Sequence, residues 1–295
     1  MLVDQGKDKA LIDQQPTLKI QSGPVLIPRD TRLFLLFLSE INLVIGALFY
    51  VYPDISISLW PWAVKPLAVR FFGAIFLAIT FGCWTALRAR MWQRAKILLL
   101  VGGTFFGIAS IVALSQVFNP NLRFAIWPWF TFFGASAIGC LVLLWRHGWS
   151  RENEKESIKD TMPIHARIFF GFQTLIVGFF GIIMLLAPDV AQAQFWPWHV
   201  AKPTLQAFAG LFLATCLATG WASLQRDVLK VRVLLPLDMI FPSLALLAVG
   251  IHWNVISSES PAALVTGIWV FVYSFVAVGS TILFLATRSK TGASY

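Results

Sequence analysis

The sequence predicts an all-α integral membrane protein with about eight transmembrane helices. Hydrophobic residues make up 58% of the 295 residues and charged residues only 13%, and the mean hydropathy is +0.74. Long apolar runs recur along the chain, and a helix needs about 20 such residues to cross roughly 30 Å of hydrocarbon. A membrane barrel would instead show alternating segments of about ten residues.

Each of the first four predicted spans is bounded by proline, which a helix interior disfavours, or by a charged residue, which is costly in hydrocarbon. These spans are Leu33–Tyr52, which ends before Pro53; Leu67–Leu87, between Pro66 and Arg88; Ile97–Phe118, between Lys96 and Pro120; and Trp127–Trp145, between Arg123 and Arg146.

The last four predicted spans follow the same rule. They are Ile168–Ala187, between Arg167 and Pro188; Leu205–Leu224, between Pro203 and Arg226; Val233–Trp253, which follows Arg232; and Ala262–Ala286, between Pro261 and Arg288.

The positions of the basic residues predict that both termini are cytoplasmic. Nineteen of the 23 lysines and arginines fall on the side that carries the termini, against Lys65, Arg123 and Lys202 on the other. Such an excess marks the cytoplasmic side. The net charge of +9 is therefore explained by membrane topology. We expect contact with anionic lipid headgroups and no nucleic-acid partner.

A duplication divides the chain into two four-helix repeats, which share one orientation and imply a pseudo-twofold axis along the membrane normal. The first loop carries Pro53-Asp54, Trp60-Pro61-Trp62 and Lys65-Pro66, and the corresponding second-half segment carries Pro188-Asp189, Trp196-Pro197-Trp198 and Lys202-Pro203. The offset grows from 135 to 137 through two insertions. A weaker copy, Trp127-Pro128-Trp129, follows Pro120-Asn121.

The repeat defines the expected organisation of the chain. Residues 1–30 form a polar tail without the apolar segment of a signal peptide, and residues 288–295 form a second cytoplasmic tail. The remaining segments are a first repeat at 31–147, a charged linker at 148–164 and a second repeat at 165–287.

The Trp-Pro-Trp loops are expected to lie at the membrane interface. Proline ends one span, and the Lys-Pro pairs start the next. Twelve of the thirteen tryptophans fall near predicted span ends, which is typical of aromatic belts, and only Trp269 lies well inside a span. An alternative hypothesis takes Trp60, Trp62, Trp196 and Trp198 as an aromatic box for a cationic ligand.

The sequence of these loops resembles that of uncharacterised bacterial multi-span membrane proteins. The resemblance rests on the repeated Trp-Pro-Trp, the Lys-Pro helix start and the Gly-containing span that follows. It covers about a quarter of the chain and implies no activity.

Two carboxylates inside predicted spans form the candidate polar site. Glu40 and Asp238 lie at similar depths on the cytoplasmic side, with Asn42 close to the first. An intramembrane carboxylate is costly unless it is paired, neutralised or hydrated, and Pro236 and Pro242 flank Asp238. The functional hypothesis is a proton- or cation-coupled site formed by Glu40, Asn42 and Asp238. The alternative is that each carboxylate is protonated, extends toward the interface or bonds a neighbouring helix.

The remaining candidate chemistry is sparse, and no cofactor or metal is assigned. Cys83, Cys140 and Cys216 lack CxxC spacing and are expected to be small core residues. The four histidines, two near each face, are interpreted as interfacial side chains rather than haem ligands. Gly102, Gly103 and Gly107 are interpreted as a helix-packing surface.

Two functional hypotheses follow from these observations. The first is a non-catalytic scaffold or accessory subunit in a bacterial inner membrane, with the bilayer and other membrane subunits or a second copy as partners. The alternative is a small proton- or cation-coupled transporter or channel using Glu40 and Asp238. No enzyme motif is visible.

Overall fold

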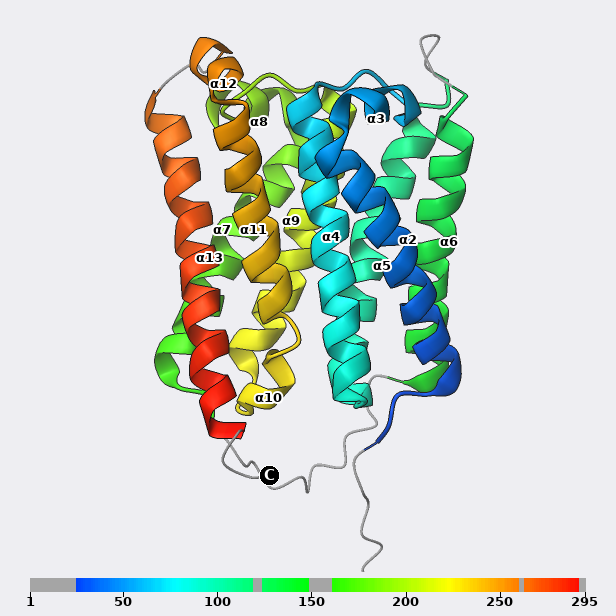
Figure 1. The fold of residues 1–295 in the computed structure, drawn as a ribbon, viewed down its shortest axis with the longest axis vertical. Coiled ribbons are helices and arrows are strands. Elements are labelled where there is room, and N and C mark those ends of the chain that lie inside the picture. Colours follow the sequence, from blue (N-terminus) through cyan, green and yellow to red (C-terminus); the bar gives the residue numbers. More distant parts are fainter. Residues whose placement is uncertain (1–24, 119–123, 149–160, 260–262, 292–295) are drawn as a thin grey trace, which may run out of the picture.

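Among the residues that the structure describes, seven helices are long and apolar enough to cross a membrane. The computed structural model describes residues 25–118, 124–148, 161–259 and 263–291, and within these ranges the elements are helices and two isolated bridges. The seven helices are α2 (Arg29–Val51), α4 (Pro66–Ala89), α5 (Trp92–Ser115), α6 (Ile126–His147), α7 (Ile164–Leu186), α9 (Lys202–Leu224) and α13 (Ala263–Thr291) (Figure 1). They match seven of the predicted spans and confirm an all-α, multi-span membrane protein.

The predicted span Val233–Trp253 forms a shorter helix, α11 (Leu235–Ile251). Its 17 residues cover about 25 Å at 1.5 Å per residue, somewhat less than the hydrocarbon thickness. A single turn, α10 (Val228–Val231), precedes it, and Pro236 occupies its first turn. Proline suits the start of a helix, where its missing N–H is not needed.

Three short helices lie at one end of the bundle (Figure 1): α3 (Pro53–Leu59), α8 (Pro188–Gln194) and α12 (Trp253–Glu259). We call this end the loop side, and the opposite end, where α2 begins and α13 ends, the terminus side. Pro53 and Pro188 do not simply stop the preceding span, because each starts a short helix. The next long helices begin at the Lys-Pro pairs, at Pro66 and Lys202.

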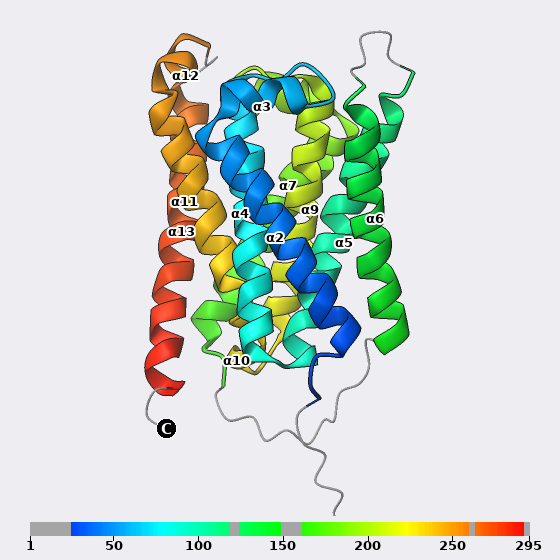
Figure 2. The same ribbon diagram turned by 45° about the vertical axis from the view of Figure 1, so that its right-hand side comes forward.

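The helices pack in pairs around a central group. In the first half α2 contacts α4, and α5 contacts α6. In the second half α7 contacts α9, and α11 contacts α13. Between the halves α4 packs on α11 and α9 on α5 (Figure 2). Because α4 is mostly enclosed and α13 mostly exposed, the core centres on α4, α5 and α9.

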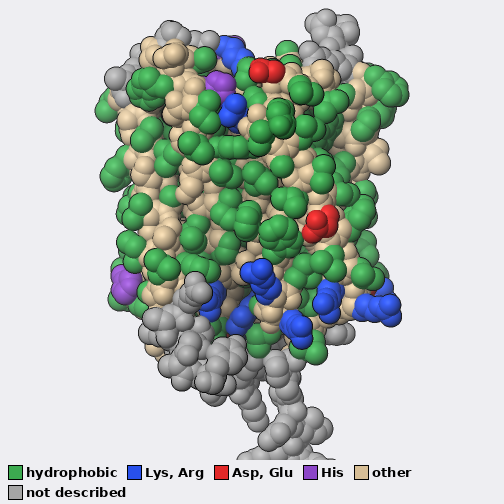
Figure 3. Space-filling view, in the orientation of Figure 1, with side chains coloured by type: hydrophobic (Ala, Val, Ile, Leu, Met, Phe, Trp, Pro, Cys, Tyr) green, Lys and Arg blue, Asp and Glu red, His purple; other side chains and the backbone are tan. Residues whose placement is uncertain are grey.

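The outer surface is apolar around its middle. In Figure 3 hydrophobic side chains cover the central belt, whereas lysines and arginines gather toward the terminus side. At that end Asp30 of α2 binds both Arg146 and His147 of α6, with the His147 Nε2 atom 2.9 Å from the carboxylate. His147 therefore takes part in a hydrogen-bonded contact between two helix ends.

The burial of the loop tryptophans differs from the predicted aromatic belt. Trp60, Trp62, Trp196 and Trp198 lie at the loop side, as expected, but their rings are buried within the protein. The chain folds back over the bundle at α3 and α8 (Figure 1). The buried indoles therefore pack inside the protein instead of facing headgroups. Trp127, Trp145 and Trp253 do remain exposed near helix ends.

The glycines of α5 and a cysteine of α6 meet at one helix contact. A side chain added at Gly102 or Gly103 would meet Cys140 of α6 at 3.2–3.4 Å, and Cys140 itself is buried. These small residues therefore allow α5 and α6 to approach closely. The tail at 1–24, the linker residues 149–160 and Asn121 lie outside the described residues.

Candidate ligand cavity

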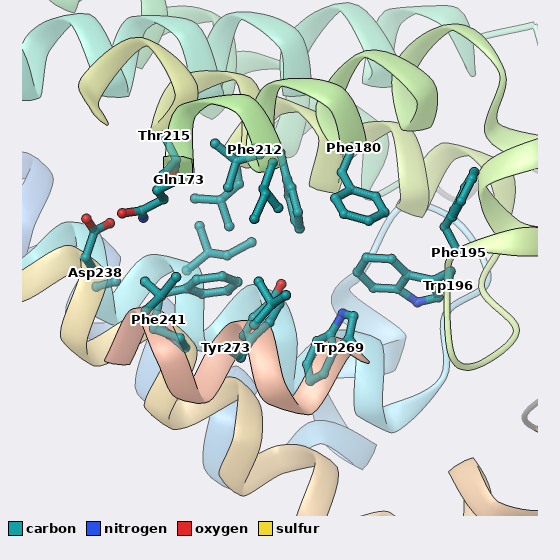
Figure 4. A pocket seen from close by; sticks show the side chains of 18 of the residues that line it. Gln173, Phe180, Phe195, Trp196, Phe212, Thr215, Asp238, Phe241, Trp269 and Tyr273 are labelled. Carbon is teal, nitrogen blue, oxygen red and sulfur yellow. The ribbon is translucent and has the colours of Figure 1, made fainter. Parts of the chain in front are cut away.

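An elongated cavity of about 320 Å³ is lined mostly by residues of the second half of the chain, with a smaller part of its wall from the first half. Its walls come from α4, α5, α7, α9, α11 and α13, together with the segment that follows α8 (Figure 4). Most lining side chains are aliphatic or aromatic. A cavity of this size, mostly apolar and with a few convergent polar groups, is typical of small-molecule sites.

One end of the cavity is polar. Asp238 of α11 and Gln173 of α7 face each other there, with Thr215 of α9 beside them (Figure 4). The exposed fractions of Asp238 and Gln173 are 9% and 3%. The Asp238 Oδ2 and Gln173 Oε1 atoms are buried without a hydrogen-bond partner among the described residues.

The helix geometry around Asp238 adds a further acceptor. Pro242 lies four residues later inside α11 and lines the same cavity. Because proline has no N–H, the backbone carbonyl of Asp238 cannot receive its usual helical hydrogen bond. Carboxylate and carboxamide oxygens thus lie at the polar end, and the Asp238 backbone carbonyl lacks its usual helical donor.

The opposite end of the cavity is aromatic. Phe180, Phe195, Trp196 and Trp269 surround it (Figure 4). Tyr273 lies between the two ends and stacks on Trp269, with ring centroids 3.9 Å apart. The Trp196 and Trp269 indole nitrogens and the Tyr273 hydroxyl are buried and also lack partners among the described residues.

Five buried polar atoms without partners thus surround one cavity. A buried donor or acceptor left unpaired costs about 1–3 kcal/mol, and native proteins contain only a few such groups. Other such atoms, among them Trp60 Nε1, Trp198 Nε1 and Ser280 Oγ, lie elsewhere in the described structure, and five gather around this one cavity. This gathering indicates a site whose polar groups are completed by a bound molecule or by water.

The structure does not bring the three candidate polar residues together. Asp238 lines the cavity, whereas Glu40 is exposed on the outer face of α2. Asn42 is buried, does not line the cavity and donates from Nδ2 to the Leu38 carbonyl oxygen at 2.7 Å. Its Nδ2 atom is thus bonded within α2, whereas its Oδ1 atom is buried without a hydrogen-bond partner among the described residues.

The four tryptophans considered as one aromatic box form two separate pairs. The Trp60 and Trp62 rings are 5.3 Å apart, and the Trp196 and Trp198 rings 5.0 Å. Of the four, only Trp196 lines the cavity.

Sequence reasoning missed Gln173, Trp269 and Tyr273 as site residues. The one available signal was the position of Trp269, the only tryptophan well inside a predicted span. An uncharged glutamine and a tyrosine in apolar helices give no comparable signal, because both are common at helix contacts.

Comparison with known protein families, with curated proteins and with solved structures found no match to this chain. The description of the cavity therefore depends on its own geometry.

Proposed function

We propose that this protein is a non-catalytic accessory subunit of a membrane complex, and that it holds a small lipophilic molecule in the cavity lined mostly by its second half. The observation that carries this proposal is the cavity itself, whose five unpaired polar atoms surround an otherwise apolar space of about 320 Å³. A lipophilic molecule with a polar group fits such a lining. The other membrane subunits, or a second copy of the chain, would receive or sense the bound molecule.

The contact between the halves favours holding a molecule over moving it across the membrane. Phe72 and Phe208, on α4 and α9, have ring centroids 4.7 Å apart. The Trp62 indole donates to the Thr204 hydroxyl at 2.8 Å across the same boundary. Rocking one half against the other, a common transport motion, would disrupt this buried contact.

The proposal includes the two-repeat architecture. It is supported by the reciprocal packing of α4 on α11 and α9 on α5. It is also supported by matching close contacts, since Phe34 packs on Gly139 and Phe169 packs on Gly279, leaving no room for a Cβ atom at either glycine. The sequence offset of 135 relates the two phenylalanines.

The residues at corresponding positions of the two repeats differ at the polar end of the cavity. Leu38 and Val101 correspond in the repeat to Gln173 and Asp238. Both line a much smaller void of about 10 Å³, and Val101 also lines the large cavity. Two apolar residues therefore occupy the first-half position, and a polar pair occupies the second. This difference supports a specialised role for the second half.

Purification in mild detergent tests the proposed function. We expect mass spectrometry and an absorbance spectrum to reveal a lipophilic molecule that accompanies the wild-type protein. Val272→Phe, which fills the cavity wall, should remove it, while Val278→Phe on the exposed face of α13 should retain it. Equal recovery of the molecule from both variants would contradict the proposal.

Transport coupled to a proton or cation is the second candidate, and the location of Asp238 in a cavity favours it. Glu40 takes no part, because it is exposed on α2. Transport predicts that Asp238→Asn abolishes flux in proteoliposomes and that Glu40→Gln leaves flux unchanged. Flux that survives Asp238→Asn would eliminate this candidate.

A further inference from the structure

We propose that the cavity selects a lipophilic cation, an amine or quaternary ammonium carrying an apolar, aromatic-compatible body, and that this ligand reaches the cavity from the lipid between α7 and α13. The proposal rests on the proposed binding function and specifies the chemical class of the ligand. Three observations support it: the polar end has an excess of acceptors, the rest of the wall is aromatic, and the mouth faces the membrane.

The polar end of the cavity attracts positive charge. Asp238 and Gln173 present oxygen atoms there, and no described lysine, arginine or histidine lines the cavity. A buried carboxylate without a cation is unfavourable in a low-dielectric site. Gln173 hydrogen-bonds to the Asp238 carboxyl group but carries no charge. A cationic ligand supplies the missing opposite charge, which a neutral lipophile does not.

The remaining wall suits the body of such a ligand. Phe241 lies beside the polar end, Tyr273 lies between the two ends, and Trp196 and Trp269 lie toward the other (Figure 4). Aromatic faces attract cations and also pack against apolar groups. Along α7 the lining runs from Gln173 to Phe180, which is about 10 Å at 1.5 Å per residue. A charged head and an aryl-alkyl body fit along this direction.

The mouth of the cavity lies on the lipid-facing surface. Toward the terminus side α7 and α13 touch, with the Phe169 and Phe275 rings 5.4 Å apart. Toward the loop side Leu264 and Ile268 of α13 line the cavity although their exposed fractions are 72% and 50%. Side chains that are both exposed and cavity-lining mark an opening, which here lies between apolar helix surfaces.

A matched pair of probes tests the cation preference. Phenylbutyl trimethylammonium and its neutral carbon isostere, in which tert-butyl replaces the ammonium group, are titrated into the purified full chain in nanodiscs, with tryptophan fluorescence as the signal. We expect the cation to bind at least about tenfold more tightly, a difference of about 1.4 kcal/mol. Asp238→Asn should remove that preference without weakening the isostere. Glu40→Gln, which neutralises an exposed carboxylate on α2, should change neither affinity.

The outcomes separate this inference from the proposed function. Equal affinity of the two probes for the wild-type protein, or a preference that survives Asp238→Asn, would overturn the cation proposal while lipophile binding stands. Failure of both probes to bind, or binding of both that is insensitive to Val272→Phe, would overturn the binding function itself. The Val278→Phe variant serves as the control for added bulk on α13. Asp238→Glu, which keeps the charge, should keep the preference and so detects a merely structural loss in Asp238→Asn.

Discussion

Gly73 lies where α2 and α4 cross at close range. A Cβ atom at this position would stand 2.7 Å from the Tyr50 backbone nitrogen and 3.0 Å from the Gly46 carbonyl oxygen. Both neighbours are backbone atoms, so the helices themselves would have to separate. Small residues serve this purpose in membrane bundles, where close backbone approach replaces the hydrophobic driving force between helices.

Gly73→Ala should therefore destabilise the protein by about 1–3 kcal/mol, the usual cost of overpacking. Thermal unfolding in detergent measures the change. Gly171→Ala is the matched control, because a Cβ atom there meets nothing within 4 Å. Since alanine favours helices more than glycine does, the control should equal or exceed the wild-type stability. An unchanged unfolding temperature for Gly73→Ala would show that α2 and α4 are not held at this distance.

At the scale of single residues, the sequence predicts charged groups better than neutral ones. Asp238 was identifiable because a carboxylate in an apolar run is rare and costly. Glu40 gave the same signal, yet it is exposed on α2, because one-dimensional depth does not determine which side of a helix faces the protein interior. Gln173 and Tyr273 became visible as site residues only when the fold placed them on the same cavity as Asp238.

At the scale of elements, Pro242 sets the local geometry of α11. It removes the helical hydrogen bond that the Asp238 carbonyl oxygen would otherwise receive, and it lines the cavity itself. Prolines persist in membrane helices where neighbouring groups or water satisfy the freed carbonyl. We therefore regard Pro242 as a component of the binding site as well as a feature of the helix.

Pro242→Ala should stabilise the fold and weaken ligand binding together. The alanine N–H can bond the Asp238 carbonyl, so the unfolding temperature should rise, by roughly 2–4 °C for each kcal/mol gained. The phenylbutyl trimethylammonium probe should bind less tightly, because the alanine N–H offsets the negative end of the Asp238 carbonyl dipole and the turn carrying Asp238 is re-formed. Calorimetry and probe titration on one preparation measure both effects. A variant that binds the probe as well as the wild type would show that the carbonyl takes no part.

Long helices were predictable, whereas short ones were not. A run of about 20 apolar residues has few other stable arrangements in a bilayer, which explains the agreement for seven spans. The seven-residue helices α3 and α8 carry no such signal. Because these two helices were not predicted, the Trp-Pro-Trp segments were interpreted as interfacial loops, and the burial of Trp60 and Trp196 was not expected.

At the scale of the whole molecule, the charge distribution predicts the topology. Green fluorescent protein fused to the C terminus should fluoresce in bacterial cells, and alkaline phosphatase at the same position should be inactive, because both report a cytoplasmic terminus. Fusing the same reporters after Phe118, in the loop that precedes α6, should give the opposite pattern. Active phosphatase at the C terminus would reverse the assignment of the two faces.

The stacked pair beside the cavity has an optical consequence. Tyr273 and Trp269 lie nearly parallel, 3.9 Å apart and inclined by 20°, and two further indoles stand within 6.3 Å of Trp269. Such close, fixed chromophores exchange excitation and should give an intense near-ultraviolet circular dichroism band. Any molecule seated against them will perturb that band, so the chain contains its own spectroscopic indicator of occupancy and needs no label.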